Sequence, residues 1–453
     1  MSQNKELISE PRFSCALSAQ QTVLAIPHAI PIVHAGPGCS SKTGSFMTSG
    51  AGFQGDGYAG GNNVPSTNMI ERDVVFGGER KLSAEVEGAL KVMKGDLFVI
   101  LAGCTSGIIG DDPKKVAREY RDQGFPVVGA ETSGFRGNTY FGHEEVIGSI
   151  VDQLLDDAKP QVQRGLINVF ASVPNIDAFW RNDLENLKAL LEKLGVRVNI
   201  LFGWSSGGVD EWKRIPDAQA NLVVSPWVGV QAARKLEARF GTPFLHEPVF
   251  PVGARATSAF LRRVGEFLGL DAGAVEEVIA REEKRYYDYF INLSNFFSDM
   301  YNNIPHEAYV VSDAHYGLGL ADFLVHDMGF SLEHMSLTCN PAGESETLVL
   351  DALRDLGDEI AGATTLDIDG YEIRAAMEPK LARGGNALIL GSTWESRLAK
   401  EHNATLLHVS LPINDDVIVT RGYFGYDGGL RLAEDIYAGV FRKGNITYMT
   451  QSS

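Results

Sequence analysis

Short apolar runs alternate with helical patterns along the first third of the chain. Residues 28–36 ("HAIPIVHAG"), 95–103 ("GDLFVILAG") and 125–132 ("FPVVGAET") are rich in apolar and β-branched side chains, which predicts buried strands. Between the first two, residues 79–94 carry apolar side chains at helical spacing, which predicts an amphipathic helix. Strands that alternate with helices in this way are typical of a parallel α/β protein.

The same pattern opens again near residue 165 and once more near residue 306, after a long aromatic helical segment around 272–303. We therefore predict an α/β protein of three doubly wound, Rossmann-like domains with parallel sheets. The predicted domains are residues 1–163, which hold three of the cysteines, residues 164–300, which end in the aromatic helical segment, and residues 301–453, which end in a C-terminal helix and tail.

The amino-acid composition argues against some classes of binding partner. The formal net charge is −18, from 40 Lys and Arg against 58 Asp and Glu, and no basic run stands out, which argues against nucleic-acid binding. No stretch approaches about 18 consecutive apolar residues, and the N-terminus lacks the apolar core of a signal peptide. We expect a cytoplasmic protein without a membrane segment, in which the four cysteines do not form a disulfide scaffold.

Three of the cysteines occupy positions that favour a functional role. Cys39 follows the strand "IPIVHA" and Cys104 follows "DLFVILAG", so both lie at the carboxyl ends of predicted parallel strands, where ligands bind in open α/β sheets. Cys15 precedes the first strand and is close enough in sequence to fold back over that edge. The alternative is structural, because free cysteine is among the most buried residue types.

Several chemical roles are open to such thiols. A nucleophile needs a base nearby, and although His28 and His34 are close in sequence, no protease or transferase motif surrounds the cysteines. A zinc site favours closely spaced ligand pairs, which are absent here. An iron–sulfur cluster tolerates long spacings, and three ligands make sense when a second subunit completes the site.

The segments around these cysteines resemble a known family. "FSCALSAQ", "IPIVHAGPGC" and "LAGCTSGIIGDD", with "STNMIERDVVFGGERKL" and the C-terminal "GYFGYDGGLRLAEDIYAGV", are similar to subunits of nitrogenase component 1. The resemblance implies that Cys15, Cys39 and Cys104 ligate half of a P-cluster-type 8Fe-7S cluster, shared with an α-type subunit in an α2β2 heterotetramer. It also implies an ATP-dependent iron protein as the transient electron donor. The sequence itself has no GxxxxGK[ST] phosphate-binding loop, so the ATP chemistry belongs to that partner.

The resemblance also indicates the subunit type. At the two positions where α-type subunits ligate the complex iron–sulfur cofactor with cysteine and histidine, this chain has Ser225 and Phe424. Serine is a poor iron ligand beside a thiolate, and phenylalanine cannot ligate. The chain therefore resembles the β-type subunit, and the complex cofactor is expected in the partner α subunit.

Other candidate residues are interpreted as structural. Cys339, His315 and His408 are expected to be polar loop or core residues, and Asp111 and Asp112 are expected to cap the helix that begins at Pro113. Some P-clusters gain a serine ligand on oxidation. The corresponding position here is Gly134, preceded by Ser133, so this chain has no serine at the matching position.

The loops around the cysteines resemble nitrogenase-like reductases outside nitrogen fixation more than nitrogen-fixing β subunits. The favoured reaction is reductive C–S cleavage, as in methylthio-alkane reductase. The alternatives are the β subunit of a vanadium or iron-only nitrogenase, and a cofactor-assembly scaffold of the same family. Tetrapyrrole reductases match the cysteine pattern less well, and a dinucleotide-binding oxidoreductase is disfavoured because no GxGxxG opens any of the sheets.

Overall fold

The structure is a computed structural model that describes residues 10–55, 57–60 and 63–443. The N-terminal residues 1–9, on which part of the signal-peptide argument rests, lie outside the described residues. Within the described residues, no helix is long and apolar enough to cross a membrane.

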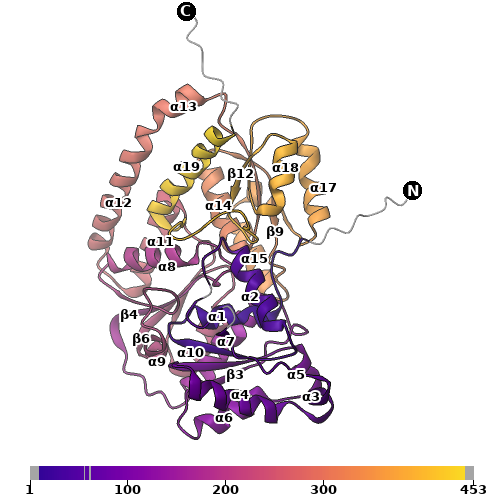
Figure 1. The fold of residues 1–453 in the computed structure, drawn as a ribbon. Helices are drawn as coiled ribbons and strands as arrows, with labels where there is room; N and C mark the ends of the chain where they lie inside the picture. The colour runs from indigo at the N-terminus through magenta and orange to yellow at the C-terminus, as the bar shows by residue number, and fades with distance from the viewer. Residues whose placement is uncertain (1–9, 56, 61–62, 444–453) are drawn as a thin grey trace, which may run out of the picture.

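Three separate parallel sheets follow one another along the chain (Figure 1). The first has the order β1-β2-β3, the second β5-β4-β6-β7 and the third β10-β9-β8-β11-β12. Every strand pairing within them is parallel. The predicted α/β fold with parallel sheets is therefore confirmed. The strands are β1 (Ala29–His34), β2 (Leu97–Ala102), β3 (Val127–Ala130), β4 (Gln163–Phe170), β5 (Arg197–Ile200), β6 (Ala218–Val224), β7 (Phe244–Glu247), β8 (Glu307–Ser312), β9 (Ser331–Leu337), β10 (Thr364–Leu366), β11 (Ala387–Gly391) and β12 (Thr405–His408).

Helices connect the strands and cover the faces of the sheets (Figure 1). Around the first sheet they are η1 (Ala16–Ala19), α1 (Gln20–Leu24), α2 (Cys39–Gly50), α3 (Glu71–Phe76), α4 (Glu79–Val92), α5 (Cys104–Ile109), α6 (Pro113–Arg121) and α7 (Thr139–Leu154). Around the second they are α8 (Trp180–Glu192), α9 (Val209–Lys213), η3 (Ile215–Asp217), α10 (Val230–Phe240), α11 (Gly253–Leu268), α12 (Ala272–Asn292) and α13 (Ser294–Met300). Around the third they are α14 (Ala314–His326), α15 (Glu344–Asp355), α16 (Asp358–Gly362), α17 (Gly370–Leu381), η4 (Thr393–Glu395), α18 (Ser396–Glu401) and α19 (Gly425–Arg442).

The strands of the first sheet are buried along their whole length, which explains why they read as continuous apolar runs. The long aromatic segment forms α12 and α13, which run along one edge of the molecule beside α11 and α19 (Figure 1). The C-terminal helix α19 packs on α11 and α12 as well as on β12, so the last segment of the chain ties the second and third sheets together.

A buried ion pair fixes the N-terminal segment to the third sheet. Arg12 is almost fully buried, and its two terminal nitrogens donate to the two carboxylate oxygens of Glu395 at 3.0 and 2.7 Å. One of these nitrogens also donates to Ser392 Oγ at 2.9 Å. Bidentate arginine–carboxylate pairs combine strength with geometric precision, so the segment just before Cys15 is held by residues nearly four hundred positions away.

Candidate functional site

Cys39 lies at the connection between the first strand and the helix that follows it. β1 ends at His34, and Cys39 is the first residue of α2. The residue between turn and helix is Gly38, whose φ of +82° lies in the left-handed region that favours glycine. The turn therefore favours glycine at the position immediately before Cys39.

Cys104 stands at the equivalent point of the neighbouring strand. β2 ends at Ala102, which is in register with His34 of β1, and Cys104 begins α5. The backbone N–H of Gly103 donates to the carbonyl oxygen of His34 at 3.0 Å, so the two turns are joined directly. Parallel pairing thereby places both cysteine-bearing turns at one edge of the sheet, as expected for adjacent parallel strands.

Cys15 reaches the same edge from the N-terminal segment. It forms an isolated antiparallel bridge with Asn138, just before α7. Its neighbour Ser14 accepts a hydrogen bond from the backbone N–H of Thr139 at 3.0 Å and donates its own N–H to Thr139 Oγ1 at 2.9 Å. The structure thus brings together the three cysteines singled out in the sequence, from three separate segments.

The other two cysteines lie close enough to Cys39 to act on it electrostatically. Burial raises the pKa of Cys39, and the nearby Cys15 and Cys104 raise it further. Among the described residues, no group of three or more His, Cys, Asp or Glu side chains is placed to hold a single metal ion.

The backbone of Gly134 lies directly against two of the cysteines. Its backbone N–H donates to Cys104 Sγ at 3.3 Å. A Cβ at this position would lie 3.3 Å from both Cys104 Sγ and Cys15 Cβ, so a side chain would crowd the thiols. Ser133, one residue earlier, is buried, and its Oγ accepts from the backbone N–H of Phe135 at 3.3 Å. Glycine, rather than serine, thus faces the cysteines.

The donor set and its surroundings fit an iron–sulfur cluster. Three thiols supply the soft ligands that such clusters use, and an N–H donor to sulfur is a recognised means of tuning their potential. Cys15 is exposed, and Cys39 and Cys104 are half-buried, so the thiols open onto the surface of this chain.

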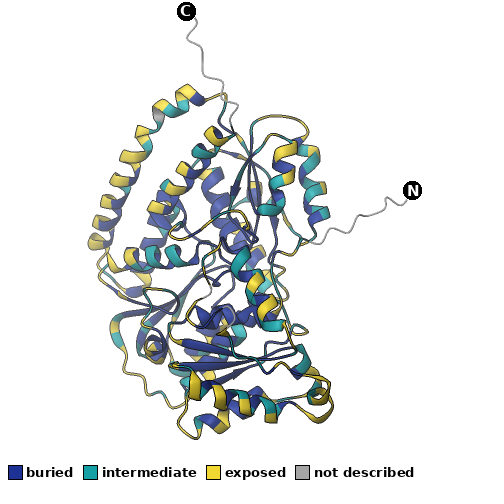
Figure 2. Ribbon diagram, in the orientation of Figure 1, coloured by how far each residue is buried: buried dark blue, intermediate teal, exposed yellow. Residues whose placement is uncertain are grey.

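Large apolar side chains are exposed on α5, which begins at Cys104, on α3, which packs against α5, and beside Gly134. Ile108 on α5 and Phe135 beside Gly134 are each 69% exposed, and Phe76 on α3 is 82% exposed. Figure 2 shows α3 as mostly exposed and α5 as a mixture of mainly intermediate and exposed residues. Apolar side chains gathered around an open site are typical of a surface that another protein covers.

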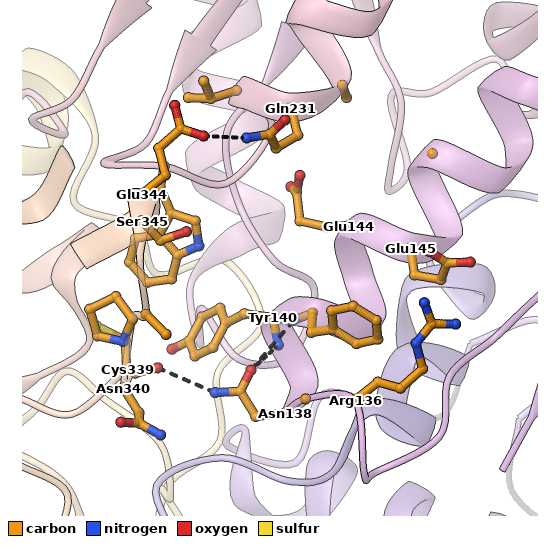
Figure 3. Close-up of a pocket in the computed structure, with 18 of the residues that line it drawn as sticks. Arg136, Asn138, Tyr140, Glu144, Glu145, Gln231, Cys339, Asn340, Glu344 and Ser345 are labelled. Carbon is orange, nitrogen blue, oxygen red and sulfur yellow. Dashed lines mark hydrogen bonds between the residues drawn. The ribbon is translucent and has the colours of Figure 1, made fainter. Parts of the chain in front are cut away.

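A cleft of about 1210 Å³ lies directly beside Cys15, between α7, α10 and the loop that follows β9 (Figure 3). Its lining includes Cys15, Tyr140, Glu144, Trp227, Cys339 and Asn340. Cys339 is buried in the wall, where burial raises the pKa of its thiol to about 12, so this thiol stays protonated at neutral pH. No sequence pattern predicts this cleft.

The position of α7 explains why reasoning from the sequence misses Glu144. The apolar pattern predicts a helix over 143–158, which would place Glu144 in a polar first turn. The helix in fact begins at Thr139, because the Asn138 side chain accepts from the backbone N–H groups of Tyr140 and Phe141. Glu144 is therefore one turn beyond Tyr140 on the same face, and it points into the cleft (Figure 3).

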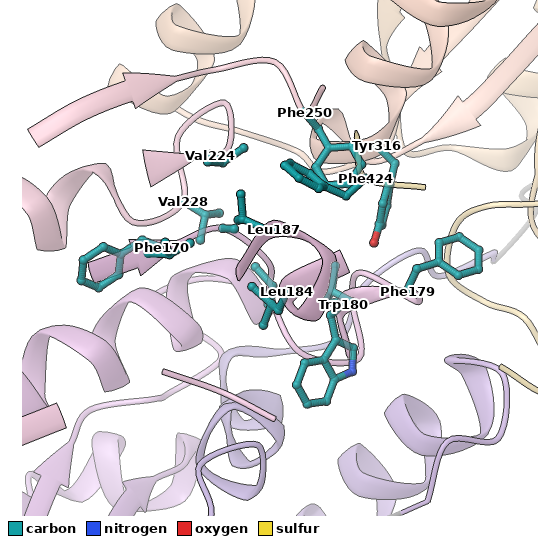
Figure 4. Close-up of a cluster of buried hydrophobic side chains, with 14 of the residues drawn as sticks. Phe170, Phe179, Trp180, Leu184, Leu187, Val224, Val228, Phe250, Tyr316 and Phe424 are labelled. Atoms are coloured by element: carbon teal, nitrogen blue, oxygen red, sulfur yellow. The ribbon is translucent and has the colours of Figure 1, made fainter. Parts of the chain in front are cut away.

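Ser225 and Phe424 lie in a different environment from the thiols. Both are buried. Phe424 packs edge-to-face against Phe250, with ring centroids 5.4 Å apart, and Phe250 packs in the same way on Tyr316 at 5.3 Å. Figure 4 shows these rings within a cluster of buried apolar side chains. The space around Phe424 is thus filled by aromatic rings.

The remaining candidates have the following places. His315 is buried, which lowers its pKa to about 3, and its Nε2 lies 4.0 Å from a carboxylate oxygen of Asp177. His408 ends β12, with Nδ1 3.5 Å from the Asp415 carboxylate. Asp112 caps α6 by accepting from the N–H groups of Lys114 and Lys115, as predicted.

The capping prediction for Asp111 is wrong. Its carboxylate accepts instead from the backbone N–H of Gly78 and lies 2.8 Å from His34 Nε2. The Asp111 side chain therefore turns inward to the end of β1, while the next residue in the sequence caps the helix. Neighbouring aspartates are chemically alike, so the sequence did not separate the two roles.

Comparison with known proteins assigns the fold to a family. The family model of nitrogenase component 1 type oxidoreductases matches residues 14–441. The chain belongs to this family. The structure is similar to that of "Nitrogenase Cp1 at pH 6.5", with a TM-score of 0.78, 19% identity and coverage of 98% of this chain and 95% of that chain. At that identity the likeness establishes the fold.

Its curated relatives have different functions. The chain is 30% identical over 280 residues to the nitrogenase molybdenum-iron protein alpha chain of Methanosarcina barkeri, covering 60% of this chain and 51% of that one. It is 28% identical over 275 residues to the cofactor biosynthesis protein NifE of Methanococcus maripaludis, covering 60% and 53%. It is 23% identical over 401 residues to one of the subunits of light-independent protochlorophyllide reductase from Angiopteris evecta, covering 82% and 72%. The first two alignments span about half the length of the relative.

Proposed function

We propose that the chain is the β-type subunit of the catalytic component of a nitrogenase-like reductase. In this role Cys15, Cys39 and Cys104 hold half of a P-cluster-type 8Fe-7S cluster, shared with an α-type subunit of an α2β2 heterotetramer. When bound, the cluster relays single electrons from an ATP-dependent iron protein toward a complex iron–sulfur cofactor in the α subunit. The observation that carries the proposal is the meeting of three thiols at one open sheet edge.

The residues around the thiols have defined tasks in this proposal. Gly134 leaves room beside two cysteines and donates an N–H to Cys104 Sγ. The exposed side chains of Phe76, Ile108 and Phe135 form an apolar rim for the partner subunit, which excludes water from the shared site. The filled aromatic surroundings of Phe424 support the placement of the complex cofactor outside this chain.

Iron analysis tests the cluster assignment. The protein is isolated anaerobically with its co-purifying subunit, as wild type, as Cys39→Ala and as Cys339→Ala. We expect Cys39→Ala to lose the iron and the low-temperature magnetic signals of the shared cluster, whereas Cys339→Ala keeps both, because Cys339 is buried after β9 of the third sheet. Undiminished signals in Cys39→Ala would overturn the assignment.

We further propose that the reaction is reductive C–S cleavage of methylthio-alkanes. Two electrons and two protons convert the thioether to an alkane and methanethiol, breaking one C–S bond and forming one C–H and one S–H bond. The test supplies the complex with its iron protein, ATP and ethyl methyl sulfide, and measures methanethiol and ethane. Formation of ammonia from dinitrogen without methanethiol would instead favour a vanadium or iron-only type of nitrogenase.

One observation favours a second candidate, a cofactor-assembly scaffold. The cleft beside Cys15 lies within this chain and is large enough for a bulky group. A scaffold releases its cluster to an apo-enzyme and does not turn over substrate. Transfer of iron from the purified protein to an apo-enzyme, without ATP-dependent reduction of any substrate, would support this candidate over the reductase.

A further inference from the structure

Two helices build facing sides of the cleft beside Cys15, and the loop after β9 completes it. Tyr140, Glu144 and Gly148 recur every four residues along α7 and so lie on one face of that helix, which lines the cleft. Trp227 and Gln231, just before α10 and at its start, line the other side. Figure 3 shows Glu144 pointing into the open space between these elements.

The charged side chains at the rim of the cleft are paired with one another. Lys235 lies 2.7 Å from Asp152, and Lys114 lies 3.2 Å from Glu145. Arg234 pairs with Glu344, and Arg136 pairs with Glu131. The four cations in the lining thus each have a carboxylate partner, which leaves the rim nearly neutral.

Glu144 differs from these residues. Its carboxylate accepts one hydrogen bond, from the backbone N–H of Gly229 at 2.6 Å, and it forms none of the ion pairs found among the described residues. Burial raises the pKa of Glu144 to about 7, and only the Gly229 hydrogen bond lowers it. A half-buried carboxyl group without a nearby cation gains most from a ligand that brings a positive charge.

Aromatic side chains line the same cleft as this carboxyl group, and two of them pack against each other. Tyr140 and Trp227 are 5.3 Å apart between ring centroids. The guanidinium of Arg136 lies over the neighbouring ring of Phe141, 5.7 Å from its centroid, which is a cation–π contact. Aromatic faces attract organic cations, and they also provide apolar contact for the body of such a molecule.

We propose that this cleft binds an organic cation of the alkylammonium or sulfonium class, whose charge pairs with Glu144 and whose apolar body packs against Tyr140 and Trp227. The same arrangement disfavours an anionic ligand, which would meet the carboxylate without a cation to compensate. The inference does not depend on a cluster at the three thiols, so it stands or falls separately from the proposed function.

Calorimetric titration of the purified protein, in the oligomeric form in which it is isolated, tests the inference. The probes are benzyltrimethylammonium, its uncharged carbon isostere neopentylbenzene, and benzoate. The variants are Glu144→Gln, which keeps shape and the Gly229 hydrogen bond, and Glu145→Gln, a control that removes a neighbouring rim carboxylate already paired with Lys114.

We expect benzyltrimethylammonium to bind at least tenfold more tightly than the other two probes. Glu144→Gln should weaken that binding at least tenfold and leave neopentylbenzene unchanged, and Glu145→Gln should stay within about twofold of wild type. Equal affinity for the cation and its isostere, preference for benzoate, or an unaltered Glu144→Gln variant would each overturn the inference. Iron content, measured on the same samples, separates this result from the cluster assignment.

Discussion

The imidazole of His34 and the carboxylate of Asp111 join the two cysteine-bearing turns of the first sheet from within the protein. His34 Nε2 lies 2.8 Å from Asp111 Oδ2, and both side chains are buried. Thr67 Oγ1 lies 3.2 Å from His34 Nδ1, and Ser106 Oγ donates to the His34 carbonyl oxygen at 2.9 Å. The strand that precedes Cys39 and the segment that follows Cys104 are thereby held at a fixed distance.

Removal of the Asp111 carboxylate is therefore expected to be costly. In Asp111→Ala both the His34 ring and the Gly78 N–H lose a buried partner, so the free energy of unfolding should fall by roughly 2–4 kcal/mol. Asp112→Ala is the matched control, because it removes only a helix cap, which is worth about 1 kcal/mol. Denaturant unfolding of the two variants measures the difference, and equal losses would contradict this account.

A side chain at position 134 should disturb the site without unfolding the protein. The Cβ of Gly134→Ala would lie 3.3 Å from Cys104 Sγ, so we expect lower iron content or an altered magnetic spectrum with a nearly unchanged midpoint of unfolding. Gly88→Ala, on α4, is the control, since a Cβ there meets no atom within 4 Å and alanine favours helix. Identical spectra for Gly134→Ala and wild type would count against a cluster at this position.

Stability should depend on pH through Glu144. When the pKa of a carboxyl group is higher in the folded than in the unfolded state, the free energy of unfolding is greatest below the unfolded pKa. It falls as the pH rises from there through the folded pKa. For Glu144 this window runs from 4.5 to about 7. Relative to Glu144→Gln, the wild type should therefore lose roughly 2–3 kcal/mol between pH 5 and pH 8, in the absence of ligand. Unfolding curves of both proteins at several pH values check this, and a constant difference would exclude the shift.

The aromatic cluster around Phe424 should matter for stability rather than for the thiol site. Phe424→Ala leaves a void against Phe250 and Phe260 and should cost roughly 3–5 kcal/mol. Phe424→Leu retains most of the buried volume and should cost less. Iron content per folded protein is expected to stay at the wild-type level in both. A loss of iron in Phe424→Leu would show that this region also supports the cluster.

The parallel fold could be predicted from the sequence because the strands of the first sheet are buried on both faces and appear as unbroken apolar runs. The positions of Cys39 and Cys104 followed from the same reasoning, since adjacent parallel strands end at one edge. The cleft could not be predicted, because it depends on how α7, α10 and the loop after β9 pack, and on a helix start set by Asn138. The split roles of Asp111 and Asp112 likewise depend on tertiary contacts.

Because of the Arg12–Glu395 pair, the three cysteines are not all anchored to the same sheet. Cys39 and Cys104 are fixed to the first sheet, whereas Cys15 follows directly from a segment anchored at the end of the third. Cys15 is also held to the start of α7, beside the first sheet, by its bridge to Asn138 and by the hydrogen bonds between Ser14 and Thr139. The short segment that carries Cys15 therefore connects the thiol edge of the first sheet to the end of the third.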